Sequence, residues 1–195
     1  MANNLIVPLV LSAVVTLALL ITVHVVPKWY EQSRTDSTVI RKLDTGIWRL
    51  CDELNVPIVG FSSRACKAFD ITTRKIHVYR GVRAAQAFAI IATVFAGLGL
   101  ISTLIIEFDI TKVVLLKLPR IFFAVSGFAI AIAALSFVAF ISQDGEDGDF
   151  DTSRHGFRVT NKYGASFIIA WVTLVPAYVA GLLAHFHHSA KAAAA

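Results

Sequence analysis

Four long apolar runs organise the chain, and they lie at residues 5–26, 82–106, 121–141 and 167–186. A helix needs roughly 20 residues to cross the hydrocarbon core of a bilayer, so each run is long enough to span it. A polar stretch of 55 residues, 27–81, follows the first run. This pattern predicts an all-α transmembrane four-helix bundle with polar connections.

We expect one four-span membrane domain over residues 1–195. Because the number of spans is even, both termini lie on the same side of the membrane. The loops 27–81 and 142–165 then lie together on the other side, while the linker 107–120 and the tail 187–195 lie with the termini.

The composition agrees with a membrane protein. Hydrophobic residues make up 56% of the chain and charged residues 16%, and the mean hydropathy of +0.70 is too high for a soluble domain. The first run does not resemble a signal peptide, because the residues MANN before it carry no positive side chain. The run is also longer than the apolar segment of a typical signal peptide. We therefore keep it as a transmembrane helix.

Charge and cysteine content give opposite indications for the side on which the loop 27–81 lies. The loop holds ten Lys and Arg residues and the linker 107–120 holds three, which favours the cytoplasm. The loop also contains the only two cysteines, Cys51 and Cys66. In an oxidising compartment these can form a disulfide that stabilises the folded loop by roughly 3 kcal/mol. The positive-inside rule, by which Lys and Arg favour cytoplasmic loops, also weakens for loops of about 60 residues. We place the loop outside the cell.

Aromatic and cysteine residues of this loop follow a recognisable order. Trp29 is followed by Gly46-Ile47-Trp48 and Cys51, and Cys66 lies 15 residues further on. The order resembles the first extracellular segment of the claudin superfamily, whose signature is a Trp, then Gly-Leu-Trp-x-x-Cys, then a Cys. Two further landmarks resemble the entries to the second and fourth helices of that group: Arg80-Gly81-Val82-Arg83-Ala84-Ala85-Gln86-Ala87, and Lys162-Tyr163-Gly164-Ala165-Ser166-Phe167 followed by Trp171.

The resemblance implies a small extracellular antiparallel β-sheet of five strands on a left-handed four-helix bundle. So small a sheet needs additional support, which a disulfide and buried side chains would supply; for the latter we expect Trp29, Ile47, Trp48 and Leu50. Strands are indicated by β-branched or alternating patterns at residues 71–73, 75–79 and 157–161.

Small residues in the apolar runs are suited to close helix packing in lipid. They are Gly97 and Gly99, Gly127 and Ala131, and Ala180 and Ala184. Pro176 is expected to kink the fourth helix. Arg83 lies just inside the second run, where its long side chain can snorkel outward or pair with an extracellular carboxylate.

The loop 142–165 contains a dense acidic run that invites comparison with a calcium site. Asp147, Asp149 and Asp151 match the first three ligand positions of an EF-hand, but Thr152 replaces the turn Gly and Arg158 the bidentate Glu. We expect a solvated hairpin tip, with weak calcium binding as an alternative. A third alternative is contact with the basic first loop of a neighbouring molecule, because the two loops carry net charges of −2 and +4.

Four histidines are candidates for a metal or proton site: His24, His185, His187 and His188. His24 has no acidic or His partner in the sequence pattern, and the other three lie together at the end of the fourth run. We favour plain residues of the membrane interface and expect no metal.

Two charged positions adjoin the cysteines, and the resemblance gives them a meaning. In claudins that conduct ions between cells, side chains beside the signature cysteines face the ions. Here the residue after the first cysteine is Asp52 and the residue after the second is Lys67, whereas cation-selective members tend to have an acid at the second position. A path lined by this loop is expected to oppose cations or to prefer anions.

The sequence shows no catalytic or cofactor-binding motif, so we expect neither enzyme activity nor a cofactor. Most basic residues lie in the loop 27–81, which argues against nucleic-acid binding. Two hypotheses remain. In the first, the chain is a plasma-membrane protein of cell junctions that associates laterally and across the gap with claudin-like proteins. In the second, it is an auxiliary subunit that modulates an ion channel or receptor.

Overall fold

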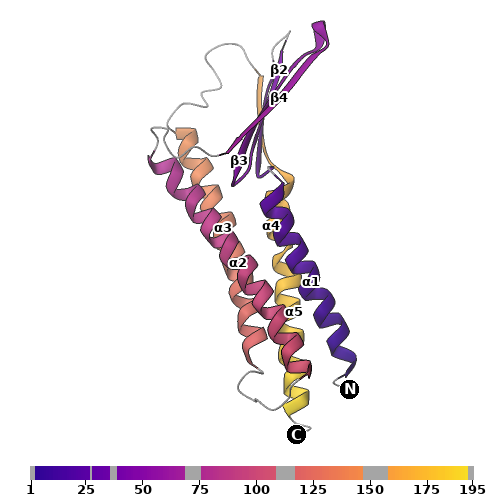
Figure 1. Ribbon diagram of the computed structural model, residues 1–195. Coiled ribbons are helices and arrows are strands. Elements are labelled where there is room, and N and C mark those ends of the chain that lie inside the picture. The colour runs from indigo at the N-terminus through magenta and orange to yellow at the C-terminus, as the bar shows by residue number, and fades with distance from the viewer. Residues whose placement is uncertain are drawn as a thin grey trace. The chain divides into compact units, whose positions relative to one another are not determined.

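The computed structural model describes residues 3–26, 28–35, 39–68, 76–108, 117–146 and 158–192 (Figure 1). Long helices and one set of short strands make up these residues. In chain order the elements are α1 Asn3–Val25, β1 Tyr30–Thr35, β2 Ile40–Thr45, β3 Arg49–Val56, the 3-10 turn η1 Pro57–Val59, β4 Phe61–Ala68, α2 Ile76–Phe108, α3 Leu118–Glu146, β5 Arg158–Tyr163, α4 Ala165–Val172 and α5 Leu174–Ala192.

Four helical stretches are long and apolar enough to cross a membrane. They are Leu5–Val25, Gly81–Glu107, Leu118–Ala139 and Ala165–Ala190. Less than half of each stretch is buried within the chain, so the remaining apolar side chains need a lipid environment. A helix suits that environment because it satisfies its backbone hydrogen bonds internally. The predicted transmembrane four-helix fold is confirmed.

The chain divides into two units. The first comprises Met1–Thr22, Ala87–Ala133 and Ala170–Ala195, and the elements that the structure describes in it are helices. The second comprises Val23–Gln86 and Ala134–Ile169, and contains the sheet together with one end of each helical span.

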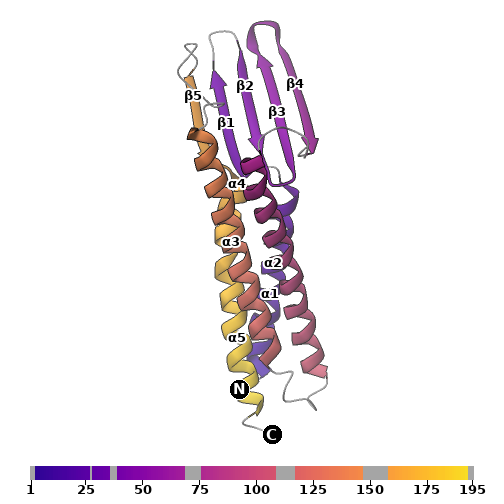
Figure 2. The ribbon, with the colours of Figure 1, turned by 90° about the vertical axis from the view of Figure 1, so that its left-hand side faces the viewer.

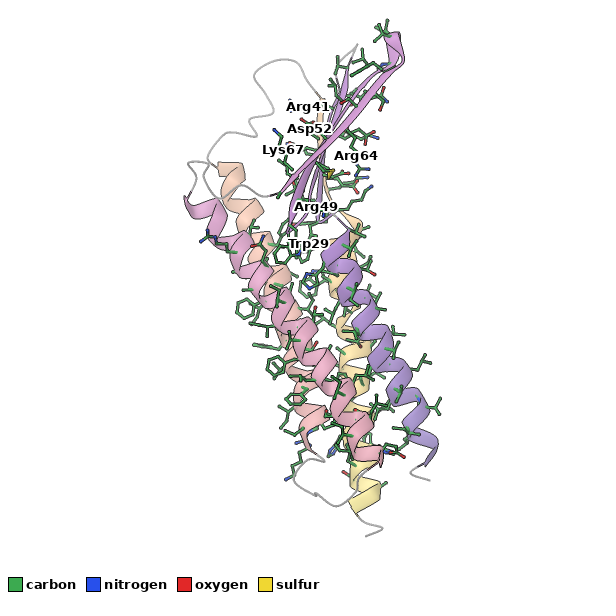
Figure 3. The ribbon with its side chains drawn as sticks, in the orientation of Figure 1. Trp29, Arg41, Arg49, Asp52, Arg64 and Lys67 are labelled. Atoms are coloured by element: carbon green, nitrogen blue, oxygen red, sulfur yellow. A yellow bond between two sulfur atoms is a disulfide. The ribbon has the colours of Figure 1, made fainter. Side chains whose placement is uncertain are left out.

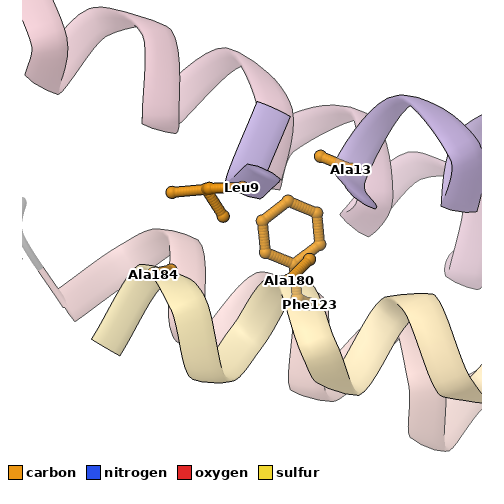
Figure 4. Packing of buried hydrophobic residues seen from close by; sticks show 5 residues of the cluster. All are labelled: Leu9, Ala13, Phe123, Ala180 and Ala184. Atoms are coloured by element: carbon orange, nitrogen blue, oxygen red, sulfur yellow. The ribbon is translucent and has the colours of Figure 1, made fainter. Parts of the chain in front are cut away.

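Small side chains let the helices of the first unit pack closely. Its core cluster contains Leu9, Ala13, Phe123, Ala180 and Ala184, and Figure 4 shows the Phe123 ring among the other four. A Cβ atom on Gly99 would lie 2.9 Å from the Phe123 ring, which explains the absence of a side chain there. Gly127 lies close to Tyr178, whereas a Cβ on Gly97 would meet nothing within 4 Å. Close packing is thus seen at four of the six expected small residues, namely Gly99, Gly127, Ala180 and Ala184.

The fourth span is interrupted at Thr173, between α4 and α5. Pro176 has no backbone N–H, so it cannot donate to the carbonyl of Val172 as a helix requires. The backbone N–H of Ala177 still donates to the Thr173 carbonyl, at 3.2 Å. The Ser12 hydroxyl on α1 donates to the Pro176 carbonyl at 2.8 Å, which joins the first and fourth spans near the interruption.

The sheet has five strands in the order β4-β3-β2-β1-β5, and every neighbouring pair is antiparallel (Figure 2). The turn between β2 and β3 is closed by the Gly46 backbone N–H, which donates to the Arg49 carbonyl at 2.8 Å. Strand β5 comes from the distant loop and pairs with β1. The five-stranded sheet implied by the resemblance is confirmed, as is the strand expected at residues 157–161.

The strand expected at residues 75–79 is wrong, because α2 already begins at Ile76. Ile76, Val78 and Tyr79 have β-forming side chains, but each residue added to an existing helix gains a backbone hydrogen bond without a new nucleation cost. The strand expected at residues 71–73 falls outside the residues that the structure describes.

Candidate functional site

Trp29 is completely buried where the sheet meets the helix ends of the second unit. Its indole Nε1 donates to the Val23 carbonyl of α1 at 3.2 Å, and its backbone N–H donates to the Thr45 carbonyl of β2 at 2.9 Å. The ring centroid lies 4.9 Å from that of Phe137 on α3 and 6.1 Å from that of Phe167 on α4. The first signature Trp therefore connects β1 and β2 with three helix ends.

The second signature Trp is held by a helix end as well. Trp48 Nε1 donates to Nδ1 of His24 on α1, at 3.1 Å. An indole N–H can only donate, so His24 Nδ1 accepts and carries no proton. Beside it, Ile47 is buried and its carbonyl accepts a 2.6 Å hydrogen bond from Gln86 Nε2 on α2. The expected burial holds for Ile47, while Trp48 and Leu50 are half-buried.

The landmark around Gly164 packs directly against the first loop. The Gly164 N–H donates to the Trp29 carbonyl at 2.9 Å, and the Ser166 N–H donates to the Lys28 carbonyl at 2.8 Å. The Ser166 hydroxyl donates to the Val26 carbonyl at 2.8 Å. A Cβ atom on Gly164 would lie 2.2 Å from the Lys28 oxygen, so only glycine fits there.

Cys51 and Cys66 form a disulfide, and no cysteine is free. The two residues are direct partners in the register of β3 and β4. Cys51 is buried and Cys66 is exposed. The bond thus joins the edge strand β4 to the interior of the sheet.

One face of the sheet carries Arg41, Asp52 and Lys67. Register places Asp52 opposite Leu43 and Lys67 opposite Leu50, and alternate residues along a strand share a face. Arg41 Nε donates to both carboxylate oxygens of Asp52, at 2.9 and 3.1 Å, and Nη2 also contacts Oδ2. These hydrogen bonds lower the pKa of Asp52 below its ordinary value. Figure 3 shows the three residues on the same side of the sheet.

The opposite face carries a second set of charges. Glu31 pairs with Lys162 at 3.0 Å and with Lys28 at 3.7 Å, and Asp44 lies 3.5 Å from Arg64. Asp44 is buried, and burial raises its pKa above the ordinary value despite the nearby Arg64 and Lys28. Burial outweighs the ion pair because the Arg64 contact is long and this guanidinium is half-exposed.

The hairpin between β3 and β4 ends in an exposed apolar tip, which we define as Pro57–Phe61. Ile58 and Val59 are each 72% exposed and Phe61 is 52% exposed. Gly60 turns the chain in the left-handed conformation, with φ of 63°, which other residues rarely adopt. All eight residues of the following strand β4 are exposed too.

The histidines at the end of α5 pair with groups on other helices of the first unit. His187 Nε2 lies 3.2 Å from Glu107 on α2, and His185 lies 3.0 Å from the Arg120 guanidinium on α3. His187 and His188 are buried, with ring centroids 5.2 Å apart. Among the described residues no group of three or more His, Cys, Asp or Glu side chains could hold a metal ion.

The remaining candidate contact residues stay predictions. Arg83 is exposed, and it makes no ion pair with any residue that the structure describes, which fits a side chain that snorkels outward. Asp147, Asp149 and Asp151 lie outside the described residues.

Two features of the site were not anticipated from the sequence. The apolar tip could have been noticed, because the letters PIVGF stand inside an otherwise polar loop. The pairing of Arg41 with Asp52 could not, since it depends on the register of β2 against β3.

A family model described as "PMP-22/EMP/MP20/Claudin family" matches residues 1–184 of the chain. No curated protein matches the chain. The matched range includes both tryptophans of the first loop, the disulfide and all four candidate membrane spans apart from the last turns of α5.

Proposed function

The chain belongs to the PMP-22/EMP/MP20/Claudin family of multi-pass membrane proteins, and from this premise we propose that it acts at contacts between cells. The sheet faces the extracellular space and associates with like proteins, laterally and across the gap, to seal or filter the paracellular space. Its termini lie in the cytoplasm. Neither a cofactor nor a catalytic group takes part in this function.

The observation that carries this proposal is the exposed apolar tip. Ile58, Val59 and Phe61 lie at the end of a disulfide-braced hairpin, and each is more than half exposed. Burying such a side chain completely is worth about 1.5–3 kcal/mol, so the tip gains most by contact with another surface. The exposed edge strand β4 lies next to it and offers unpaired backbone groups to a partner.

The disulfide supports the extracellular side. Disulfides persist in oxidising compartments, and Cys51 and Cys66 are bonded to each other. This outweighs the surplus of basic residues in the loop, because the positive-inside rule, by which Lys and Arg favour cytoplasmic loops, applies best to short loops. Asp147, Asp149 and Asp151 of the second loop would lie on the same side, where they can meet a basic partner surface.

The second candidate function is that of an auxiliary subunit of an ion channel or receptor. It is favoured by Arg49 within Gly46–Cys51, since the sequence resembles the Gly-Leu-Trp-Arg-x-Cys form of the calcium-channel gamma-type subunits. The apolar helix faces, which lipid would otherwise cover, offer a surface for such a partner.

Expression in cells without native junctions separates the two functions. We expect accumulation at cell–cell borders and a raised transepithelial resistance. The variant Ile58→Ser/Val59→Ser should reach the surface normally but lose border enrichment by about tenfold or more, which corresponds to about 1.4 kcal/mol of lost contact energy. The matched control Ile58→Leu/Val59→Ile keeps the tip apolar and should behave as wild type.

A diffuse surface distribution of the wild-type protein, together with co-purification with a channel, would favour the auxiliary subunit instead. Equal border enrichment of both tip variants would show that the tip is not the contact surface.

A further inference from the structure

A hydrogen bond between Trp48 and His24 joins the turn after β2 to the end of α1. The indole Nε1 donates to Nδ1 of the imidazole at 3.1 Å, and the two ring centroids lie 5.9 Å apart. Both residues belong to the second unit, and both are half-buried. Water can therefore reach the imidazole and exchange protons with it.

This hydrogen bond exists only while the imidazole is neutral. An indole N–H can only donate, so Nδ1 of His24 must supply the lone pair. A second proton on the ring would occupy that lone pair and place two N–H donors against each other. Histidine ordinarily gains its second proton at about pH 6.5. The contact is thus complete at neutral pH and is lost as the ring is protonated.

The cations near this contact cannot replace the lost hydrogen bond. Arg49 follows the turn and Arg83 lies on α2, and both are exposed. A guanidinium has no lone pair, so neither residue can accept a hydrogen bond from a protonated ring. On α1 itself, His24 is the one ionisable side chain in the sequence of the helix.

The acids of the neighbouring strands β1 and β2 are engaged with other cations. Glu31 pairs with Lys162 at 3.0 Å and with Lys28 at 3.7 Å. Asp44 is buried and lies 3.5 Å from Arg64. A protonated imidazole would have to compete with these basic side chains for a carboxylate.

Other contacts keep the turn folded when this bond is absent. Gln86 on α2 donates to the Ile47 carbonyl at 2.6 Å, and the Gly46 N–H donates to the Arg49 carbonyl at 2.8 Å. Neither hydrogen bond uses a group that titrates between about pH 5 and 8. Loss of the Trp48 bond therefore loosens the turn from α1 without unfolding the sheet.

We propose that His24 is an extracellular acid sensor: protonation of its Nδ1 breaks the hydrogen bond from Trp48 and releases the turn after β2 from the end of α1. Acidification of the space between cells then weakens the attachment of the sheet to the first helix. The inference goes beyond the proposed function and depends on it only for the side of the membrane, because the acid must reach the sheet from outside the cell.

Thermal unfolding of the purified full chain in mild detergent, at about pH 7.5 and at about pH 5.5, tests the energetic effect on either side of the ordinary imidazole titration. His24→Asn supplies an amide oxygen that accepts a hydrogen bond but does not titrate. Acidification should lower the unfolding midpoint of the wild type by about 2–4 °C more than that of His24→Asn. This is the shift expected for the loss of one hydrogen bond in a chain of this size.

A signal from the indole itself shows whether this contact is the one that changes. The chain has three tryptophans, so isotope-labelled tryptophan gives one indole N–H signal for each in an NMR spectrum, and Trp48→Phe identifies the signal of Trp48 by its loss. The signal should shift between the two pH values in the wild type and stay fixed in His24→Asn. The matched control His185→Asn removes a histidine of the first unit and should keep the wild-type shift.

The outcomes separate this inference from the proposed function. A fixed Trp48 signal in the wild type, or an equal shift in His24→Asn, overturns the acid sensor even if the protein accumulates at cell–cell borders. Equal falls in the two unfolding midpoints would overturn it too, because another group would then set the acid response. A shift that requires His24 supports the sensor even where no border accumulation is seen.

Discussion

Single residues of the family signature connect chain segments that are far apart in the sequence. Trp29 supplies its carbonyl to Gly164, its indole N–H to Val23 and its ring to Phe137 and Phe167. Because every polar group of this buried residue has a partner, its position costs no unsatisfied hydrogen bond. This residue of the signature therefore connects the sheet to the helix ends of the second unit.

A substitution at Gly164 tests the contact between the sheet and the helix ends most directly. In Gly164→Ala the new Cβ would lie 2.2 Å from the Lys28 carbonyl oxygen, and a backbone atom cannot rotate away. We expect a loss of about 3 kcal/mol in stability, typical of severe overpacking. Thermal unfolding of the purified protein in mild detergent, followed by fluorescence, measures this loss as a lower midpoint.

Gly97→Ala is the matched control for this substitution. A Cβ at Gly97 would meet nothing within 4 Å, and alanine is the better helix former. Its midpoint should equal or exceed that of the wild type. If both variants unfold at the wild-type temperature, the close approach of Gly164 to Lys28 is contradicted.

At the scale of elements, the two faces of the sheet respond to pH in opposite directions. Asp44 has a pKa raised above 3.8 by burial, so its stabilising contribution is complete below 3.8 and is lost as pH rises through the folded-state pKa. Asp52 has a pKa lowered below 3.8 by its hydrogen bonds to Arg41. Its contribution is present above 3.8 and is lost as pH falls through the folded-state pKa.

Substitution of each acid should remove its own part of the pH profile. As pH falls from neutral toward 3.8, the wild type should gain unfolding temperature relative to Asp44→Asn, which has no carboxylate to protonate. Below 3.8 the wild type should lose unfolding temperature relative to Asp52→Asn. Thermal unfolding over a pH series checks both, and parallel profiles for wild type and Asp44→Asn would contradict the burial of Asp44.

For the whole molecule, the even number of spans and the disulfide together predict the orientation in the membrane. An epitope inserted near Thr38 should be stained by antibody on intact cells, whereas a tag at the C-terminus should be stained only after permeabilisation. The physical reason is that Cys51 and Cys66 stay bonded outside the reducing cytoplasm. The reverse staining pattern would place the sheet inside the cell and rule out the contact function.

Much of the fold could be predicted from the sequence. Four membrane spans follow from hydropathy, because a bilayer requires a minimum length of uninterrupted apolar helix. The sheet and the cysteine pair followed from the order of Trp29, Trp48, Cys51 and Cys66 and from its resemblance to the family that the comparison then showed. The helical residues at the start of α2 were missed, because local β-propensity is weaker than extension of an existing helix.

The sequence by itself determined the membrane environment, the family and the presence of a braced sheet, since these depend on composition and on residue order. Only the tertiary structure decided which charges cancel. Arg41 and Asp52 are eleven residues apart, and their contact exists because the register of β2 and β3 brings them to one face. Tertiary structure also decided that Ile58 and Val59 stay exposed, because burial depends on neighbours supplied by distant parts of the chain.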